Sequence, residues 1–454
     1  MKNNCRIGFA GFGEVNTPKD IIVRKCAAAL AALQAEDGVE IGAQVFPITD
    51  DYPGHDVTAA VNELKKGDFD ALVLCIAGWI PTHAVITVAE QFKHLPVVLW
   101  GLCGWIEDDG RLVTTADQAG TTALRGTLDA LGYTFEYVYD IIGQKTNSRK
   151  VADFCTAASA AKRLRSAKLG TMGYRDMRLY GTLCDENQLK RDVGVEIDCF
   201  EMLEVVQRAE KVSVADIEQV IEYMKANWHF TAAPLEDALH KTAKWYLAIS
   251  EICKERNYSG VTLKDVDGMK LLLSFPPAPI FMLLSDRDGL CTVPENDCPG
   301  GATQIMLREL TQQCGGYLEF YEFMEDRVLA GVPDFIPAEI TEGQTTITPA
   351  AFGELSQGLL NVSKVKPGEL TMCRLGMKNG KLVLHLLKGE GVPCRRWEEA
   401  GWTQPAPQLP GLEIELEDVE DFADKVMCQH YIIAYGDQRE KVENLCSILG
   451  IEVI

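Results

Sequence analysis

The chain has 454 residues, of which 47% are hydrophobic and 24% are charged, proportions typical of a globular protein with room for two or three domains. Its 44 basic and 66 acidic residues give a formal net charge of -22, which opposes binding to nucleic acid and to anionic membranes. We therefore expect no nucleic-acid partner and no membrane partner, although a local pocket can still accept a small anionic substrate.

The first residues show no signal-peptide pattern, and no apolar run approaches the ~20 residues that span a bilayer. The fifteen cysteines are scattered singly without a Cys-x-x-Cys pair, so neither a zinc knuckle nor a thioredoxin-like motif is indicated. Most of the thiols are expected to be buried and reduced. These features predict a cytoplasmic protein.

Short apolar runs alternate with helical stretches from Arg6 to about Gly143. The expected strands are 6–12, 41–48, 71–79 and 96–102, and the expected helices are 20–36, 56–67 and 81–94. This alternation predicts a parallel sheet with helices on both faces, in a first domain over 1–165. Ligands of such sheets bind beyond the carboxyl ends of the strands, where "CIAGWIPTH" places Trp79 and His83.

The same pattern begins again after a helical connector at 148–167. The second part opens with the segment 168–174, which is followed by 193–205 and by two long helical stretches, 213–225 and 235–256. The segments 260–266 and 278–290 then supply further strand and helix material. A second Rossmann-like α/β domain is therefore expected over 166–316.

Beyond about Gly316 the chain consists of short strand-like segments separated by turn residues. "MKNGKLVLHLL" contains the pair Asn379-Gly380, which favours a tight hairpin. The last third, 317–454, is expected to be a mostly antiparallel β domain, a small barrel or a sandwich. The predicted fold class is therefore α/β, with two parallel α/β domains followed by a barrel-like β domain.

Two nucleotide motifs are not supported. The glycines of "GFAGFGE" fall at 8, 11 and 13, which is a tight strand-to-helix turn rather than G-x-G-x-x-G, and no P-loop sequence occurs. The loop "LGTMGYRDMRLYGTLCDE" has two interpretations that stay open. It is either a solvated loop with internal ion pairs or a loop whose Arg175 and Arg178 bind an oxygen-rich ligand.

Acidic side chains gather at two places. Glu295 and Asp297 lie in the turn "CTVPENDCPGG", and a second group, Glu319, Glu322, Glu325 and Asp326, lies in "YLEFYEFMEDR". Alone, each group is typical of a solvated face. Two acids from separate strand ends together with a histidine suit an octahedral Mn²⁺ or Mg²⁺ ion. His430 precedes an apolar strand, so the alternative to a metal ligand at this position is an imidazole packed in the core. His385 alternates within a strand and is more typical of a structural or solvent-facing residue.

Over nearly its full length the chain resembles the L-fucose isomerase and L-arabinose isomerase superfamily. The resemblance lies in "GWIPTHAVITVAEQFKHLPVVLWG", in "GTMGYRDMRLYGTLCDENQLKRDVGVEID" and in the closing "HYIIAYGDQREKVENLCSILGIEVI". Its most specific part is the family phrase Cys-Glu-x-Asp, which here has Pro294 in place of the cysteine but keeps both acids.

The resemblance implies a metal site of Glu295, Glu319 and His430. Glu319 stands 24 residues after Glu295, where the family has an aspartate, and His430 matches the family's C-terminal histidine ligand. The implied metal is Mn²⁺, or else Mg²⁺ or Co²⁺, and Asp297 would orient a ligand or a water. The resemblance also implies trimers or hexamers in which Trp79 stacks on a sugar bound by the neighbouring subunit.

The implied reaction is aldose–ketose isomerisation through an enediolate, with Glu295 and Glu319 relaying the proton. The family commonly has a His-Cys-Gly phrase where this chain has Val332-Pro333-Asp334, which alters the expected sugar contacts. The substrate is therefore either a neutral sugar (L-fucose, D-arabinose or L-arabinose) or an anionic hexose such as sulfoquinovose beside Arg175 and Arg178. The alternative is a non-catalytic relative that binds sugar or serves as a scaffold.

Overall fold

The computed structural model describes residues 4–332, 335–350, 358–400 and 410–454. The chain forms two compact units, one made of Met1–Arg163 with Glu440–Gly450, the other of Leu164–Arg439 with Ile451–Ile454. The predicted second and third domains therefore lie mostly within one unit, and the segment at 440–450 belongs with the first. Among the described residues, no helix combines the length and apolar character needed to cross a membrane.

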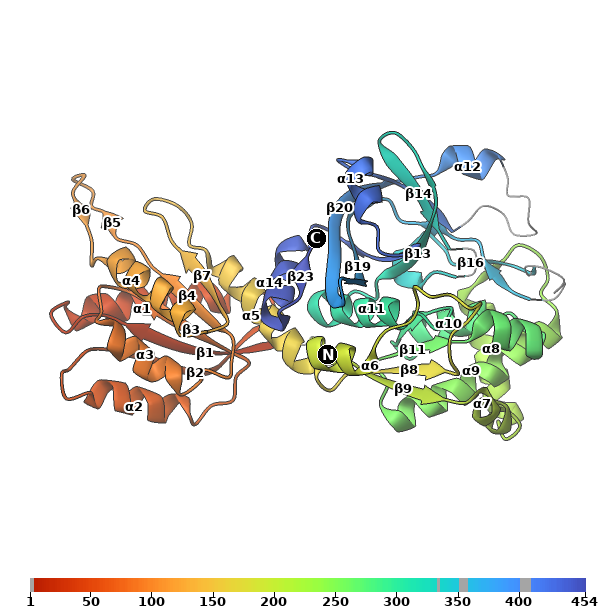
Figure 1. Ribbon diagram of the computed structural model, residues 1–454, viewed down its shortest axis with the longest axis horizontal. Coiled ribbons are helices and arrows are strands. Elements are labelled where there is room, and N and C mark those ends of the chain that lie inside the picture. The colour runs from red at the N-terminus through yellow and green to blue at the C-terminus, as the bar shows by residue number, and fades with distance from the viewer. Residues whose placement is uncertain (1–3, 333–334, 351–357, 401–409) are drawn as a thin grey trace. The chain divides into compact units, whose positions relative to one another are not determined.

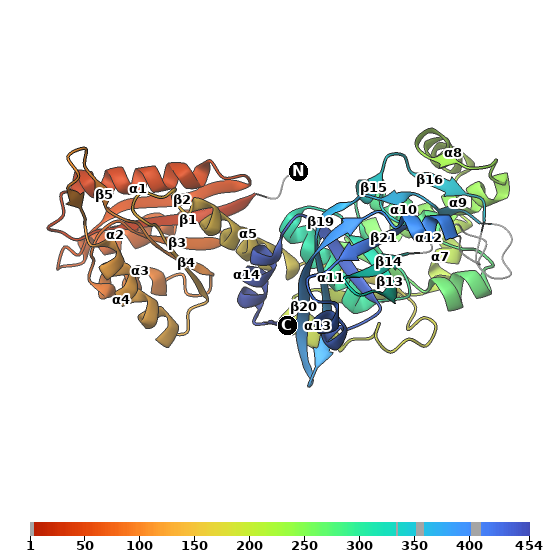
Figure 2. The same ribbon diagram turned by 90° about the horizontal axis from the view of Figure 1, so that it is seen from above.

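The first unit contains the predicted parallel sheet. Its strands, in spatial order, are β2 (Val39–Ile48), β1 (Cys5–Phe12), β3 (Ala71–Ile76), β4 (Val97–Gly101) and β7 (Phe135–Tyr139), and every pairing is parallel. One face is covered by α1 (Lys19–Gln34), α5 (Ser148–Leu164) and α14 (Arg439–Leu449), the other by α2 (His55–Leu64), α3 (Thr82–Glu90) and α4 (Asp117–Ala130) (Figures 1 and 2). Both faces are thus buried, as the continuous apolar strands require.

A second, four-stranded parallel sheet lies in the second unit. Its spatial order is β12 (Cys291–Val293), β11 (Gly260–Leu263), β8 (Lys168–Met172) and β9 (Glu196–Phe200). Its helices are α6 (Glu186–Asp192), α7 (Met202–Ala209), α8 (Val214–Asn227), α9 (Glu236–Arg256), α10 (Ala278–Asp286) and α11 (Cys298–Thr311) (Figure 1). The segments 260–266 and 278–290, expected as strand and helix material, form the strand β11 and, for the most part, the helix α10. This helix is buried on all sides over 278–285, and an apolar run of that kind lacks the periodicity that separates helix from strand.

The C-terminal region contains the predicted antiparallel sheet. Its strands follow the order β19 (Gly368–Lys378), β22 (His430–Tyr435), β13 (Gly316–Phe323), β14 (Arg327–Gly331), β21 (Gly411–Glu415) and β20 (Lys381–Val392). A pairing between β19 and β20 closes these six strands into a ring, and β23 (Glu452–Val453) adds to β20 in parallel. The predicted hairpin is confirmed, because Asn379 and Gly380 at its tip have φ values of +52° and +75°.

Shorter elements complete the described chain. They are β5 (Trp105–Ile106), β6 (Leu112–Val113), β10 (His229–Phe230), β15 (Thr341–Glu342), β16 (Thr346–Thr348), β17 (Leu360–Asn361), β18 (Lys364–Val365), α12 (Arg395–Ala400), α13 (Val419–Lys425), a π-helix at Asp265–Lys270 and a 3₁₀ turn at Ala338–Ile340.

Candidate active site

The turn that carries Glu295 lies at the carboxyl edge of the second parallel sheet. It follows β12 directly, and the neighbouring loops follow β11 and β8. The strand order changes direction between β8 and β11, so this edge is the crevice in which ligands of open parallel sheets bind.

The backbone of this turn is strained. Glu295 and Asn296 have φ values of +64° and +51°, a left-handed conformation that costs a residue with a side chain on the order of 1–3 kcal/mol. The neighbouring loops hold it in place. Asp265 Oδ1 accepts the Glu295 amide at 2.7 Å, and the Asn296 side chain donates to the carbonyls of Met172 (2.9 Å) and Tyr174. Two consecutive strained residues held by the loops after β8 and β11 indicate a functional position for Glu295.

The register of β13 and β22 places the second acid opposite the histidine. Glu319 and His430 are direct partners in this antiparallel pair, and the Phe320 amide donates to the Gln429 carbonyl at 3.0 Å. Directly opposed residues project from the same face of a sheet. Tyr317 stands two residues before Glu319 and so projects from that face as well.

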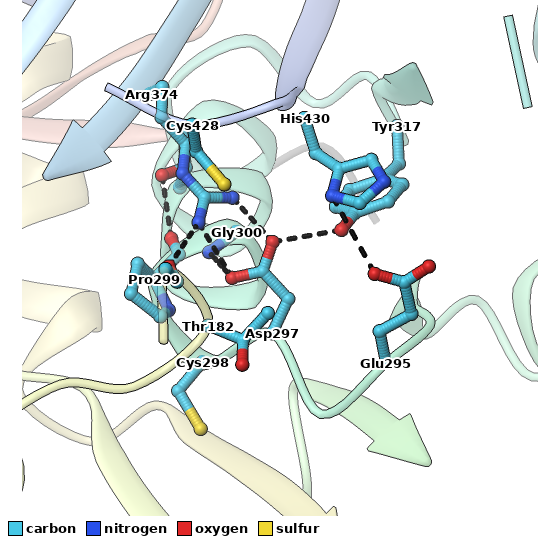
Figure 3. Close-up of polar contacts among 12 residues, drawn as sticks. Thr182, Glu295, Asp297, Cys298, Pro299, Gly300, Tyr317, Arg374, Cys428 and His430 are labelled. Atoms are coloured by element: carbon cyan, nitrogen blue, oxygen red, sulfur yellow. Dashed lines mark hydrogen bonds and ion pairs between the residues drawn. The ribbon is translucent and has the colours of Figure 1, made fainter. Parts of the chain in front are cut away.

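Glu295 and Glu319 approach His430 from two sides. Glu295 Oε2 lies 3.8 Å from His430 Nδ1, and Glu319 Oε1 lies 3.9 Å from His430 Nε2. The imidazole is buried, whereas the Glu295 and Glu319 side chains are 16% and 31% exposed. Figure 3 shows the Glu295 carboxylate directed at the imidazole. The structure thus brings together three residues that the sequence predicted as one site.

His430 is neutral in this environment. Burial lowers its pKa to about 3, with Arg374 adding to the effect and Asp297 opposing it. Nδ1 is buried and makes no hydrogen bond. A buried polar atom without a partner costs roughly 1–3 kcal/mol, and an ion at the site would remove that cost.

The donor set fits a hard divalent ion. Two ligands of one ion with bonds of about 2.1 Å lie at most about 4.2 Å apart, and both carboxylate–imidazole separations are shorter than that. Among the described residues, however, no three His, Cys, Asp or Glu side chains are already arranged to hold a metal. The two acids face opposite ring nitrogens, so an ion on one nitrogen requires one carboxylate to move. The more exposed Glu319 has room to do so.

Asp297 is fully buried and caps α11. Burial alone would raise its pKa, but the charge and hydrogen bonds of Arg374 together with other contacts hold the pKa below its usual value. The carboxylate also accepts the Tyr317 hydroxyl, and the Tyr317 ring stacks on His430 (Figure 3). Asp297 is thus connected to the candidate ligand His430 through Tyr317 and makes no direct contact with it.

The loop that carries Arg175 and Arg178 adjoins the site through Tyr174. The Arg175 guanidinium lies over the Tyr180 ring at 4.7 Å, and Arg175 and Asn296 are among the residues that line a cavity of about 30 Å³. Arg178 is exposed. Neither guanidinium has an acidic partner in the described chain, and Asp176 instead accepts backbone amides, including that of Val266. The internal ion pairs of the first interpretation are therefore not formed by these arginines.

Two predicted sugar-binding residues lie in the other unit. Trp79 and His83 follow β3 in the first unit, and both are exposed. Val332 is buried just after β14, whereas Pro333 and Asp334 of the altered family phrase lie outside the described residues.

The sequence alone did not single out Tyr317, Arg374, Asp265 or Asn296. One signal was present for Arg374, a charged residue in the middle of the apolar strand segment "LTMCRLGM". Asp265 had a weaker signal, since it is an acidic residue near the end of the predicted segment 260–266.

No protein-family model matches this sequence, and no match is found among curated proteins. The interpretation of the site therefore depends on its geometry and on the motifs described above.

Proposed function

We propose that the protein is a divalent-metal-dependent aldose–ketose isomerase acting on a free sugar. The observation that carries the proposal is the placement of His430 between two carboxylates, one on a strained turn and one in direct cross-strand register. The resemblance to the L-fucose and L-arabinose isomerases supports the same reaction.

The reaction moves one proton between carbons and one between oxygens. A carboxylate takes the proton from C2, the C–H electrons form a C1=C2 double bond, and O1 gains a proton to give an enediol. Loss of the O2 proton and protonation of C1 then give the ketose. Glu295 and Glu319 are the acid–base pair in this proposal. A bound Mn²⁺, Mg²⁺ or Co²⁺ would supply a Lewis acid for the charge that develops on the sugar oxygens.

The neutral imidazole of His430 would serve as a ligand together with the two acids. Its depressed pKa keeps it unprotonated throughout the neutral pH range, so no proton has to leave before it binds an ion. By the same resemblance we propose a trimer or hexamer in which Trp79 contacts sugar in a neighbouring subunit. We also propose His83, near the same strand end, as a sugar contact, and a cytoplasmic location for the protein.

The substrate has two candidate classes. Neutral sugars such as L-fucose, D-arabinose and L-arabinose follow from the resemblance. A hexose with an anionic group, such as sulfoquinovose going to 6-deoxy-6-sulfofructose, is favoured by the arginines Arg175 and Arg178, which have no acidic partner in the described chain of a strongly acidic protein. The alternative function is non-catalytic sugar binding or a scaffold.

The test is aldose-to-ketose conversion over a panel of neutral and anionic sugars, after chelator treatment and again after Mn²⁺ is added. We expect turnover that depends on Mn²⁺, that is lost in Glu295→Gln and in His430→Ala, and that persists in the matched control Glu322→Gln on the exposed part of β13. Absence of turnover with every sugar, together with absence of Mn²⁺ binding, would leave the scaffold alternative.

A further inference from the structure

A buried ion pair lies directly behind the candidate ligands. Arg374 on β19 and Asp297 are 1% and 0% exposed. Arg374 Nη2 donates to Asp297 Oδ1 at 2.8 Å, and Nη1 donates to Oδ2 (Figure 3). Nη2 also donates to the Gly181 carbonyl at 3.2 Å. This two-point contact, out of water, holds each side chain in a single orientation.

The Asp297 carboxylate connects this pair to both sides of the site. Its Oδ1 accepts the Gly300 amide at 2.9 Å, which fixes the start of α11 just after Glu295. Its Oδ2 accepts the Tyr317 hydroxyl at 2.9 Å. With the two bonds from Arg374, these contacts occupy the acceptor positions of the carboxylate, so none is left for an ion or a sugar.

Tyr317 extends the connection to His430. The two rings are stacked with centroids 4.4 Å apart and an angle of 25° between their planes. The imidazole makes no hydrogen bond to any described residue, and its Nδ1 is one of the buried atoms without a partner. The stacked phenol, anchored at its hydroxyl, is thus in a position to set the plane of the imidazole.

We infer that Arg374, Asp297 and Tyr317 form a positioning unit that fixes both the turn carrying Glu295 and the plane of His430. The inference rests on the proposed function, because it assigns these residues a role in holding two ligands of one ion. Metal-binding histidines are usually oriented through their second ring nitrogen. Here the orienting contact is made through the face of the ring.

The test compares two tyrosines that each lose only a hydroxyl. Tyr317→Phe removes the link between Asp297 and the stacked ring but keeps the ring and the ion pair. Tyr431→Phe is the matched control. Its hydroxyl is also buried and hydrogen-bonded, to the Met427 amide and His385, and as the next residue on β22 it points to the opposite face of the sheet.

Mn²⁺ binding to chelator-treated protein is measured by titration calorimetry, alongside the thermal unfolding midpoint of each variant. We expect Tyr317→Phe to raise the Kd for Mn²⁺ by about 10–100-fold, the usual effect of losing a contact that orients a ligand. Tyr431→Phe should leave the Kd within about threefold while lowering the unfolding midpoint. Arg374→Lys, which keeps the charge but loses the paired donors, should also weaken binding.

The possible outcomes distinguish a failure of the positioning role from a failure of the proposed function. Equal Mn²⁺ affinity in Tyr317→Phe and the parent protein would overturn the positioning role and leave the proposed metal site intact. A parent protein that binds no Mn²⁺ would overturn the proposed function and, with it, this inference. If Arg374→Lys fails to fold, the comparison of the two tyrosines still decides the question.

Discussion

Glu319 and His430 face each other across β13 and β22, with Glu319 Oε1 3.9 Å from His430 Nε2. The backbone register fixes this relationship, so it does not depend on the conformation of a loop. The side chain of Glu319 nevertheless keeps enough exposure to change its rotamer. This combination of a fixed backbone and a movable carboxylate suits a residue that both binds an ion and transfers a proton.

Two substitutions of Glu319 should distinguish the effect of its charge on activity from the effect of its side-chain length. Glu319→Gln removes the carboxylate proposed to act in proton transfer and is expected to lower kcat/KM for isomerisation by about 10²–10⁴-fold. Glu319→Asp keeps the charge on a side chain one methylene shorter and should retain a clearly larger share of activity. Steady-state kinetics with saturating Mn²⁺ measures both. Equal activity in Glu319→Gln and the parent protein would remove Glu319 from the reaction.

Breaking the buried ion pair between Arg374 and Asp297 should lower the stability of the fold. Arg374→Met leaves the Asp297 charge buried without its partner, and we expect a loss of about 3–5 kcal/mol in the free energy of unfolding. The double variant Arg374→Met with Asp297→Asn removes both charges and should recover part of that loss. Urea unfolding of the parent protein, the single variants Arg374→Met and Asp297→Asn, and the double variant gives the interaction energy. Additive losses would show that the two charges do not stabilise each other.

Gly300 should tolerate no side chain. A Cβ at this position would lie 2.4 Å from Asp297 Oδ2 and 2.6 Å from Arg374 Nη1. We expect Gly300→Ala to lower stability by about 1–3 kcal/mol. The matched control is Gly126→Ala in α4, where a Cβ meets nothing within 4 Å, and this change should stabilise its helix by about 0.5–1 kcal/mol. Thermal unfolding measures both, and shifts of the same sign would contradict the steric argument.

His385 should make stability depend on pH. Burial lowers its pKa from 6.5 to about 4, with Lys425 adding to the effect and Asp421 opposing it. Because the unfolded chain takes up this proton at a higher pH than the folded one, stability falls as the pH drops from 6.5 towards 4. At pH 5 the loss from this residue is about 2 kcal/mol. Urea unfolding at pH 7.5 and pH 5 should show a smaller drop for His385→Gln than for the parent protein, and equal drops would rule out His385 as a source.

The parts of the fold that follow local patterns were predictable from the sequence. The first parallel sheet, the Asn379-Gly380 hairpin and the meeting of Glu295, Glu319 and His430 agree with expectation, the last through a family resemblance. The pairing of Asp297 with Arg374 was not predictable, because the two residues are 77 positions apart and meet only when the antiparallel strands have closed over α11. Nor does periodicity reveal that Glu295 is held in a left-handed conformation. That conformation depends on the contact of its amide with Asp265 and on the bonds that the next side chain, Asn296, makes to the loop after β8.

The C-terminal helix α14 has a consequence for how the chain can be divided. The chain leaves the first unit after Arg163, returns to it at Glu440 and leaves it again after Gly450. Val442, Leu445 and Cys446 of α14 are buried, and Ile448 packs against the core of the first unit. A single cut near residue 163 therefore does not separate the two units, because α14 of the first unit stays on the fragment that carries the second. A fragment ending there would lack the helix that completes its core, so separate expression of the first unit requires residues 440–450 to be supplied as well.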